Sequence, residues 1–272
     1  MKYSVLMSVY KKDNPDFLKL ALESIYEGQT RKPDEVVVVF DGPLTERQYA
    51  VLDGFKQGKE NIVFYYPQPE NKGLGEALRI GAEKCTGEYI FRMDSDDISD
   101  GRRFEKQMAY IELHPEIDVL GSNIAEFDSS LDENMRVRVC PEYHDDIVEM
   151  SKRRNPMNHM SVCVKRSALE KCGGYKPLML MEDYFLWLRM IASGCRLANI
   201  NESLIYARTG NGFYSRRGAK EQIKSRGRLQ AFMLEHHMIG RLDAVINMAY
   251  IIGFTYCPKG VKKFVYDKFL RK

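Results

Sequence analysis

The sequence predicts an α/β fold: a Rossmann-like, mostly parallel central sheet flanked by helices, followed by a helical C-terminal extension. Short apolar segments rich in β-branched residues alternate with helical patterns over the first hundred residues, which is typical of strand–helix–strand units. Val36–Phe40 is an unbroken apolar run, as expected for a strand buried on both faces of a parallel sheet. Ligands of such sheets bind beyond the carboxyl ends of the strands, so polar residues at those ends are the first site candidates.

Residues 1–100 carry the clearest alternation. Strands are expected at Tyr3–Val9, Val36–Phe40, Ile62–Tyr66 and Glu88–Met93. A helix is expected after Asp13-Asn14-Pro15, because these turn and helix-start residues precede apolar residues at helical spacing. A further helix is expected over Gly73–Cys85. This order predicts an open parallel sheet with right-handed crossovers.

The pattern is looser after residue 100. A helix is expected at 101–114, strands near Asp118–Phe127 and at Val162–Val164, and a helix at Tyr184–Ala192. From about Gly218 the chain is mainly helical in pattern. We therefore expect an α/β domain over 1–210, with halves 1–100 and 101–210, and a helical extension over 211–272 that ends in a basic amphipathic tail.

The charge is unevenly distributed along the 272 residues. The chain carries a net +3, and residues 258–272 hold six lysines and arginines against one aspartate, a net +5. The remaining residues therefore sum to −2, which argues against a protein that binds nucleic acid over its whole surface. A hydrophobic content of 44% is too high for a disordered chain.

The sequence predicts a cytoplasmic protein. The N-terminus turns polar too early for a signal peptide, and the longest apolar stretch, Ala244–Tyr256, is shorter than the roughly 18–20 residues of a membrane span. None of the six cysteines forms a C-x-x-C pair, so free thiols in a reducing compartment are expected rather than a zinc or redox site.

Asp94-Ser95-Asp96-Asp97 is the sharpest local motif. Three carboxylates in four residues repel one another unless a cation or donor groups compensate for the charge. Oxygen ligands of this kind suit Mg²⁺ or Mn²⁺, and the motif directly follows an expected strand. A solvated acidic turn that caps the next helix is the alternative interpretation.

Glu182-Asp183 places two carboxylates in a strongly apolar stretch. A partly desolvated carboxylate has a raised pKa and is a plausible general base, although an acidic pair is also favoured at a helix start. Asp41, after the apolar run, could bind a base or ribose, or simply form an Asp-Gly turn. His159 is a weaker candidate, because a lone histidine is more often structural. The basic residues between 208 and 228 could hold a pyrophosphate or form a solvated helix face.

Together these residues resemble the inverting nucleotide-sugar glycosyltransferases of family 2, which have the GT-A fold. The resemblance covers roughly residues 2–210 and rests on five elements in the family's order. They are the opening strand Ser4–Tyr10, Val36–Phe40 ending at Asp41, Asn71-Lys72-Gly73 before a helix, the acidic motif at 94–97, and Glu182-Asp183.

The resemblance implies roles for individual residues. Ser8, Val9, Tyr10 and Asp41 would hold the uracil and ribose of a UDP-sugar, with Lys72, Arg79, Asp94 and Ser95 near the nucleotide. Asp96 and Asp94 would hold Mn²⁺ or Mg²⁺, and Asp183 would be the catalytic base with Glu182 beside it. Candidates for the diphosphate or acceptor are His159, Arg208, Arg216 and Arg217.

The resemblance also implies a biological setting. A Q-x-x-R-W element typical of processive synthases is absent, which favours transfer of a single sugar. The donor would be a UDP-hexose or UDP-N-acetylhexosamine, and the acceptor a glycan, expected to be linked to a lipid pyrophosphate in bacterial surface-polysaccharide (O-antigen or capsule) synthesis. The basic tail could attach a cytoplasmic enzyme peripherally to the anionic inner face of the membrane, or it could form a helix that packs on the catalytic domain with a solvated basic face.

Two other functions remain open from the sequence. A sugar-nucleotide pyrophosphorylase also joins an α/β sheet to nucleotide and metal, but its glycine-rich loop after the first strand is missing here, where the residues are Tyr10-Lys11-Lys12-Asp13-Asn14. A non-catalytic nucleotide-sugar binding subunit would not need both acidic motifs.

Overall fold

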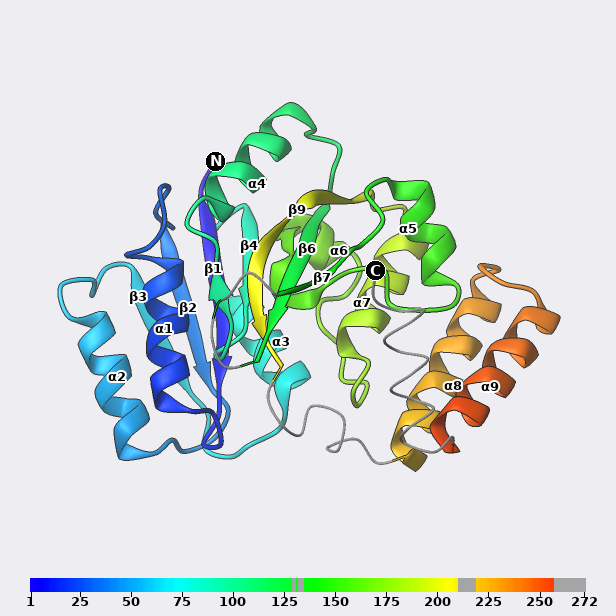
Figure 1. The fold of residues 1–272 in the computed structure, drawn as a ribbon, viewed down its shortest axis with the longest axis horizontal. Helices are drawn as coiled ribbons and strands as arrows, with labels where there is room; N and C mark the ends of the chain where they lie inside the picture. Colours follow the sequence, from blue (N-terminus) through cyan, green and yellow to red (C-terminus); the bar gives the residue numbers. More distant parts are fainter. Residues whose placement is uncertain (129–130, 132–134, 210–218, 257–272) are drawn as a thin grey trace.

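The computed structural model describes residues 1–128, 131, 135–209 and 219–256. Its centre is a mixed sheet in which most paired residues run parallel (Figure 1). The α/β class expected from the sequence is therefore confirmed. Arg216, Arg217 and the basic tail after Tyr256, all singled out in the sequence, lie outside the described residues.

The first half forms one parallel block. Its strands lie in the order β3 (Val63–Pro67), β2 (Glu35–Phe40), β1 (Tyr3–Val9) and β4 (Tyr89–Met93). The connecting helices are α1 (Pro15–Ile25), α2 (Glu46–Lys56) and α3 (Leu74–Lys84). No residue range was expected for α2 from the sequence, although the alternation of strands and helices required a helix between β2 and β3. β2 is buried along its whole length, which agrees with its unbroken apolar pattern.

The second half extends the sheet with both strand directions. β8 (Cys163–Lys165) pairs antiparallel with β4 and with β6 (Val119–Phe127), while β9 (Leu197–Arg208) runs parallel to β6. Two short strands, β5 (Ile98–Ser99) and β7 (Arg136–Arg138), pair antiparallel with β9 and β6 respectively. β9 was not expected from the sequence, because its pairing with β6 jumps from Ile200 to Ser203 and this irregularity hides the alternation of a strand.

Helices cover both faces of the sheet. α4 (Arg103–Leu113) shares one apolar core with α1, α2 and one face of β1 and β4. A second core on the other face contains α3, α5 (His144–Ser151), α6 (Arg166–Lys171) and α7 (Glu182–Ala192). α3 packs very closely, since a Cβ at Gly81 would lie 2.3 Å from Leu6 Cδ1 and 2.8 Å from Val39 Cγ2.

Two helices form a hairpin beyond the sheet, α8 (Ala219–Glu235) and α9 (Arg241–Tyr256), at the right of Figure 1. α8 docks on the outer side of α7 through a third apolar cluster, which includes Leu188 of α7 and Leu229 and Met233 of α8. Phe185 and Phe232 meet edge to face in the same contact, with centroids 5.3 Å apart. Within the described residues, no helix is both long and apolar enough to cross a membrane.

The cysteines are structural. The five in the described residues are free and buried, as expected, and Cys257 lies outside that part of the chain. Burial raises the pKa of the Cys85 and Cys163 thiols, so these groups remain protonated and unreactive near neutral pH.

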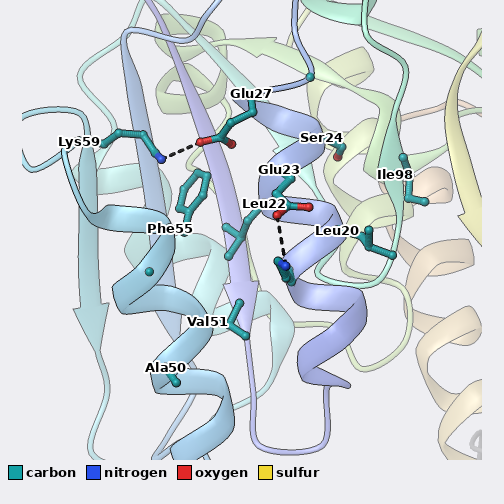
Figure 2. Close-up of a pocket in the computed structure, with 13 residues that line it drawn as sticks. Leu20, Leu22, Glu23, Ser24, Glu27, Ala50, Val51, Phe55, Lys59 and Ile98 are labelled. Atoms are coloured by element: carbon teal, nitrogen blue, oxygen red, sulfur yellow. Dashed lines mark hydrogen bonds and ion pairs between the residues drawn. The ribbon is translucent and has the colours of Figure 1, made fainter.

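A surface hollow of about 840 Å³ lies between α1 and α2 (Figure 2). Its wall is apolar at Val51 and Phe55, and an ion pair of 2.6 Å joins Lys59 Nζ to Glu27 Oε1 beside it. The hollow contains none of the polar residues at the carboxyl ends of β1, β2 and β4. Chemistry is therefore expected at those strand ends and not in this hollow.

Candidate functional site

The carboxyl ends of three parallel strands meet at one edge of the sheet. Val9 of β1 pairs with Phe40 of β2, and Met7 of β1 pairs with Met93 of β4. The segments that follow, at Tyr10, Asp41 and 94–97, are therefore neighbours in space, as the sequence predicted. Ser8 and Tyr10 are partly exposed here, whereas Val9 is buried.

Asp13 joins two of these strand ends. Its Oδ2 accepts hydrogen bonds from the Tyr10 backbone N–H at 3.0 Å and from Ser95 Oγ at 2.7 Å. Burial, together with Asp96 and Asp94 nearby, raises the pKa of Asp13 to about 6. From the sequence, Asp13 was expected only to start a helix. Its position as the first acid after the opening strand could have marked it as a site residue.

The acidic cluster has the arrangement of a metal site. Oxygens of Asp94, Asp96 and Asp97 lie within 4.8 Å of one another. Burial and the Asp94 charge raise the pKa of Asp96 to about 6 and raise that of Asp97 well above its usual range. Buried Oδ2 of Asp97 has no hydrogen-bond partner within the described residues. These residues fit a divalent cation, and Asp97 joins the two ligands expected from the sequence.

Two arginines offset part of the acidic charge. Arg92, the last residue but one of β4, is buried and forms an ion pair with Asp94. Arg208, at the end of β9, donates its backbone N–H to Asp97 Oδ1 at 2.9 Å and its Nε–H to the Asp96 carbonyl at 3.3 Å. The Arg208 guanidinium also lies 3.7 Å from the centroid of Phe17. Arg208 was a sequence candidate, whereas Arg92 was missed.

Asp41 holds the loop that precedes α3. Its carboxylate accepts from the backbone N–H groups of Lys72 at 2.7 Å and Gly73 at 3.0 Å, and from Asn71 Nδ2 at 2.9 Å. Asp41 is 5% exposed, so its direct role here is to fix this loop against the end of β2. Gly73 needs its φ of +92°, which few other residues adopt.

Lys72 and Arg79 lie at the rim of the site. Lys72 is exposed, and its Nζ lies 3.4 Å from Glu70 Oε1. Arg79 is held by acids of its own helix, with 2.7 Å from Nη2 to Glu76 Oε1 and 2.6 Å from Nη1 to Glu83 Oε1. The structure therefore does not direct the Arg79 guanidinium to the acidic cluster.

Asp183 lies in the first turn of α7. Its Oδ2 accepts from Asn155 Nδ2 at 2.6 Å and its Oδ1 from the Tyr184 N–H at 2.7 Å. Burial raises the Asp183 pKa, while the two hydrogen bonds and the charges of Arg138 and Arg92 act in the opposite direction. Such a carboxylate is a suitable proton acceptor at neutral pH. Asn155 was not found from the sequence.

Glu182 brings the two halves of the site together. A Cβ on Gly75 of α3 would lie 2.8 Å from Glu182 Cγ, so the first turns of α3 and α7 are in close contact. The turn before α7 contains Leu180 with φ +67°, a conformation that costs a leucine about 1 kcal/mol or more. Leu180 adopts this unfavourable conformation in the turn that sets where α7 begins.

His159 lies beneath the site. Its Nε2 lies 3.1 Å from the Tyr175 hydroxyl, and its ring meets Trp187 edge to face at 5.9 Å. Burial, with the charge of Arg92 nearby, lowers the His159 pKa well below its usual range, so the ring is neutral. A neutral, hydrogen-bonded ring supports the packing of α7 and does not offer a charge to a phosphate.

Comparison with known sequences agrees with this geometry. The family described as Glycosyl transferase family 2 matches residues 4–173. An uncharacterized glycosyltransferase of Haemophilus influenzae is 41% identical, with both chains covered completely. The Erwinia amylovora amylovoran biosynthesis glycosyltransferase AmsE is 35% identical, with 98% of each chain covered. An Escherichia coli protein named UDP-Gal:alpha-D-GlcNAc-diphosphoundecaprenol beta-1,3-galactosyltransferase is 32% identical, covering 100% of this chain and 97% of its own.

Solved structures show the same fold. TarS 1–349 of S. aureus in complex with UDP-GlcNAc superposes with a TM-score of 0.72 at 17% identity, covering 99% of this chain and 76% of its own. The mannosyltransferase PcManGT of Pyrobaculum calidifontis, in complex with GDP-Man and Mn2+, gives a TM-score of 0.59 at 13% identity, with coverages of 97% and 78%. At these identities the likeness concerns the fold alone.

Asn155→Ala is expected to raise the pKa of Asp183, because the substitution removes a hydrogen bond that favours the carboxylate. Carbon-13 NMR titration of labelled aspartates measures this directly. Asn61→Ala, at an exposed position, is the matched control and leaves the Asp183 titration unchanged. An unchanged or lowered pKa in Asn155→Ala would show that the hydrogen bond does not stabilise the charged form.

Proposed function

The chain belongs to glycosyl transferase family 2, and from that premise we propose that it moves one sugar from a UDP-sugar to a hydroxyl of a glycan acceptor, with inversion at the anomeric carbon. The observation that carries the proposal is the contact between α3 and α7. It brings the loop held by Asp41 close to Asp183. The donor would then bind on the side of Asp41 and the acceptor on the side of Asp183.

The donor belongs on the side of β1, β2 and β4. Tyr10, Asp13 and Ser95 form one hydrogen-bonded unit, and Asp41 fixes the backbone of the 71–73 loop facing it. Uracil and ribose would lie between these two units, at the carboxyl ends of the strands. The donor sugar is proposed to be a hexose or an N-acetylhexosamine.

Asp96, Asp97 and Asp94 would hold Mn²⁺ or Mg²⁺ beside the diphosphate. The orphaned Oδ2 of Asp97 and the close spacing of the three carboxylates support this assignment. When bound, such an ion supplies positive charge that stabilises the departing diphosphate. Arg208 adds a fixed positive charge on the same side, held in place by Phe17 and Phe127.

Asp183 would act as the general base. The acceptor hydroxyl oxygen forms the new bond to the anomeric carbon while its proton passes to the Asp183 carboxylate. The bond between the anomeric carbon and the diphosphate oxygen breaks, and UDP leaves with that electron pair. One displacement from the face opposite to UDP inverts the anomeric configuration, so an α-linked donor gives a β-linkage. Asn155 and the Tyr184 N–H hold the carboxylate in one orientation for this transfer.

The acceptor is proposed to be a sugar on a lipid diphosphate, in the synthesis of a bacterial surface polysaccharide. The Escherichia coli and Erwinia amylovora relatives, whose names refer to a diphosphoundecaprenol acceptor and to amylovoran biosynthesis, support this assignment. The enzyme would then work peripherally at the inner face of the membrane.

The surface of α9 supports attachment to lipid. Outward-facing side chains along the helix are apolar and 43–72% exposed: Leu242, Val245, Ile246, Tyr250, Ile252 and Tyr256. Only Ala244 and Ile251 of α9 are fully buried. A helix that is apolar on all sides is normally covered, and tyrosines suit a lipid–water boundary. The six basic residues that follow α9 in the sequence favour an anionic leaflet over a second protein copy.

The activity itself is tested by UDP release. UDP-glucose, UDP-galactose and their N-acetyl forms are each supplied with and without a sugar–diphosphate–lipid acceptor. Acceptor-dependent release supports transfer. Formation of UTP from pyrophosphate and the UDP-sugar would instead indicate a pyrophosphorylase. Binding of the UDP-sugar without turnover would indicate a non-catalytic binding subunit.

Asp183→Asn is expected to lower the transfer rate at least 100-fold, because an amide cannot accept the proton. The affinity for UDP should change less than twofold. Asp146→Asn removes an exposed acid of α5 and is the matched control, with full activity expected. More than about a tenth of wild-type turnover in Asp183→Asn would contradict general-base catalysis by this residue.

Removal of divalent cations with excess chelator is expected to abolish transfer, and added Mn²⁺ or Mg²⁺ to restore it. Asp97→Asn should weaken Mn²⁺ binding, measured by electron paramagnetic resonance on the protein without donor. Asp53→Asn, on α2, serves as the control. Full activity in chelator would remove the metal from the mechanism.

Val245→Asp with Ile246→Asp is expected to reduce binding to vesicles that contain anionic phosphatidylglycerol at least fivefold, because both side chains are exposed on the apolar face of α9. Co-sedimentation at low salt measures the effect, and deletion of residues 258–272 tests the tail separately. Unchanged vesicle binding combined with a shift from dimer to monomer would show that a second copy covers α9.

A further inference from the structure

Two arginines, Arg138 and Arg154, lie in the neighbourhood of Asp183. Arg138 of β7 is close enough for its charge to oppose the burial that raises the Asp183 pKa. Arg154 follows α5 and precedes Asn155, whose side chain donates to Asp183 at 2.6 Å. The two guanidinium groups also share a neighbour, because both lower the pKa of the buried Cys140 thiol against the effect of its burial. Residues from different parts of the chain thus bring two positive charges into the neighbourhood of Asp183.

Neither arginine has an acidic partner among the described residues. Within the described part of the chain, no carboxylate forms an ion pair with Arg138 or Arg154, whereas Arg79 and Arg166 each have an acidic partner on their own helix. Arg154 is exposed and Arg138 is half-buried. Guanidinium groups bind phosphate oxygens through paired N–H donors, so two that lie near the same Cys140 thiol and have no acidic partner in the described residues are suited to a diphosphate.

The turn that carries Arg154 is fixed on both sides. The Tyr184 hydroxyl of α7 donates to the Ser151 carbonyl at 2.6 Å, and Asn247 Nδ2 of α9 donates to the Lys152 carbonyl at 2.9 Å. Within the turn, the Arg153 and Arg154 N–H groups both donate to the Met150 carbonyl at 3.0 Å. Arg154 is therefore held between the helix that begins with the base and the helix with the exposed apolar face, which lowers the entropic cost of binding a ligand there.

We propose that Arg138 and Arg154 bind the diphosphate that joins the acceptor sugar to its lipid. This inference rests on the proposed function, in which Asp183 faces the acceptor hydroxyl. The donor diphosphate would lie on the other side, beside Arg208 and the acidic cluster. A lipid lying along α9 brings its diphosphate to the turn at 152–155, and a sugar attached directly to that diphosphate reaches Asp183. The pair thus selects an acceptor whose reactive sugar is the one next to the phosphate.

Decyl diphosphate, which has the phosphates and a short chain but no sugar, tests the site. Calorimetric titration is made on the full chain saturated with UDP, so that the donor site is filled. The variant Arg138→Gln/Arg154→Gln is expected to bind decyl diphosphate at least tenfold more weakly, with UDP affinity within twofold of wild type. Arg47→Gln removes an exposed arginine of α2, which pairs with Asp16, and should leave both affinities unchanged. Unchanged affinity for decyl diphosphate in the double variant overturns the proposal.

The single variant Arg154→Gln decides the question if the double variant also loses UDP. Because Arg154 is exposed, this change leaves the packing intact, and a threefold or larger loss of decyl diphosphate affinity supports the site. No loss overturns it. Headgroups of membrane lipids carry the same phosphate chemistry, so vesicle binding is measured in parallel. Loss of phosphatidylglycerol vesicle binding without loss of decyl diphosphate binding would also overturn the proposal.

Transfer assays separate this inference from the proposed function. With a sugar–diphosphate–alkyl acceptor the single variant Arg154→Gln, which keeps the Arg138 charge near Asp183, should raise KM at least threefold, while KM for an alkyl glycoside of the same sugar without phosphate stays unchanged. Equal losses on both acceptors overturn the diphosphate assignment and leave the glycosyltransferase function standing. A wild-type protein that binds decyl diphosphate through the arginines but transfers no sugar keeps this site and refutes the proposed function.

Discussion

Crowding of carboxylates at one edge of the sheet is the constraint on which the rest of the site depends. Asp94, Asp96 and Asp97 are brought within 4.8 Å, and Asp13 lies close enough to be affected by two of them. Like charges this close, partly removed from water, oppose folding unless positive charge or protons compensate. Arg92 from below and Arg208 from the side supply only part of that compensation. The rest of the negative charge is left for protons or a bound cation to offset.

The first half of the fold could be predicted from the sequence because burial in the sheet and against it sets the spacing of the apolar residues in its strands and helices. β1 spans Tyr3–Val9, the range the apolar run indicated, and α3 lies within the expected Gly73–Cys85. In the second half, short elements such as β7 and α5 form through pairing and packing with distant segments, which local pattern does not report. β9 was missed for a related reason, since its bulged register against β6 breaks the alternation.

The residues of the candidate site show the same difference between local pattern and long-range contact. Tyr10, Asp41 and the acidic motif were found because parallel strands must end together. Asn155 was not, because it meets Asp183 across 28 residues of chain and nothing in its neighbourhood marks it. Arg92 was missed because it lies within an apolar strand. A charged residue in a fully buried strand nevertheless indicates that an oppositely charged partner lies nearby. Arg79 donates to Glu76 and Glu83 of its own helix, and its expected place near the nucleotide stays a prediction.

The packing of α8 against α7 has one more consequence. The first turn of α7 carries Asp183, and the outer side of the same helix holds α8, which in turn holds α9. Rigid helices transmit position, so the height of the carboxylate above whatever surface α9 rests on is set by side chains such as Phe185, Leu188 and Met233. α7 thus fixes the distance between Asp183 and the exposed surface of α9. If α9 lies on a membrane as proposed, thinning or thickening this layer of side chains would change which acceptor sugar, counted outward from the lipid, reaches Asp183.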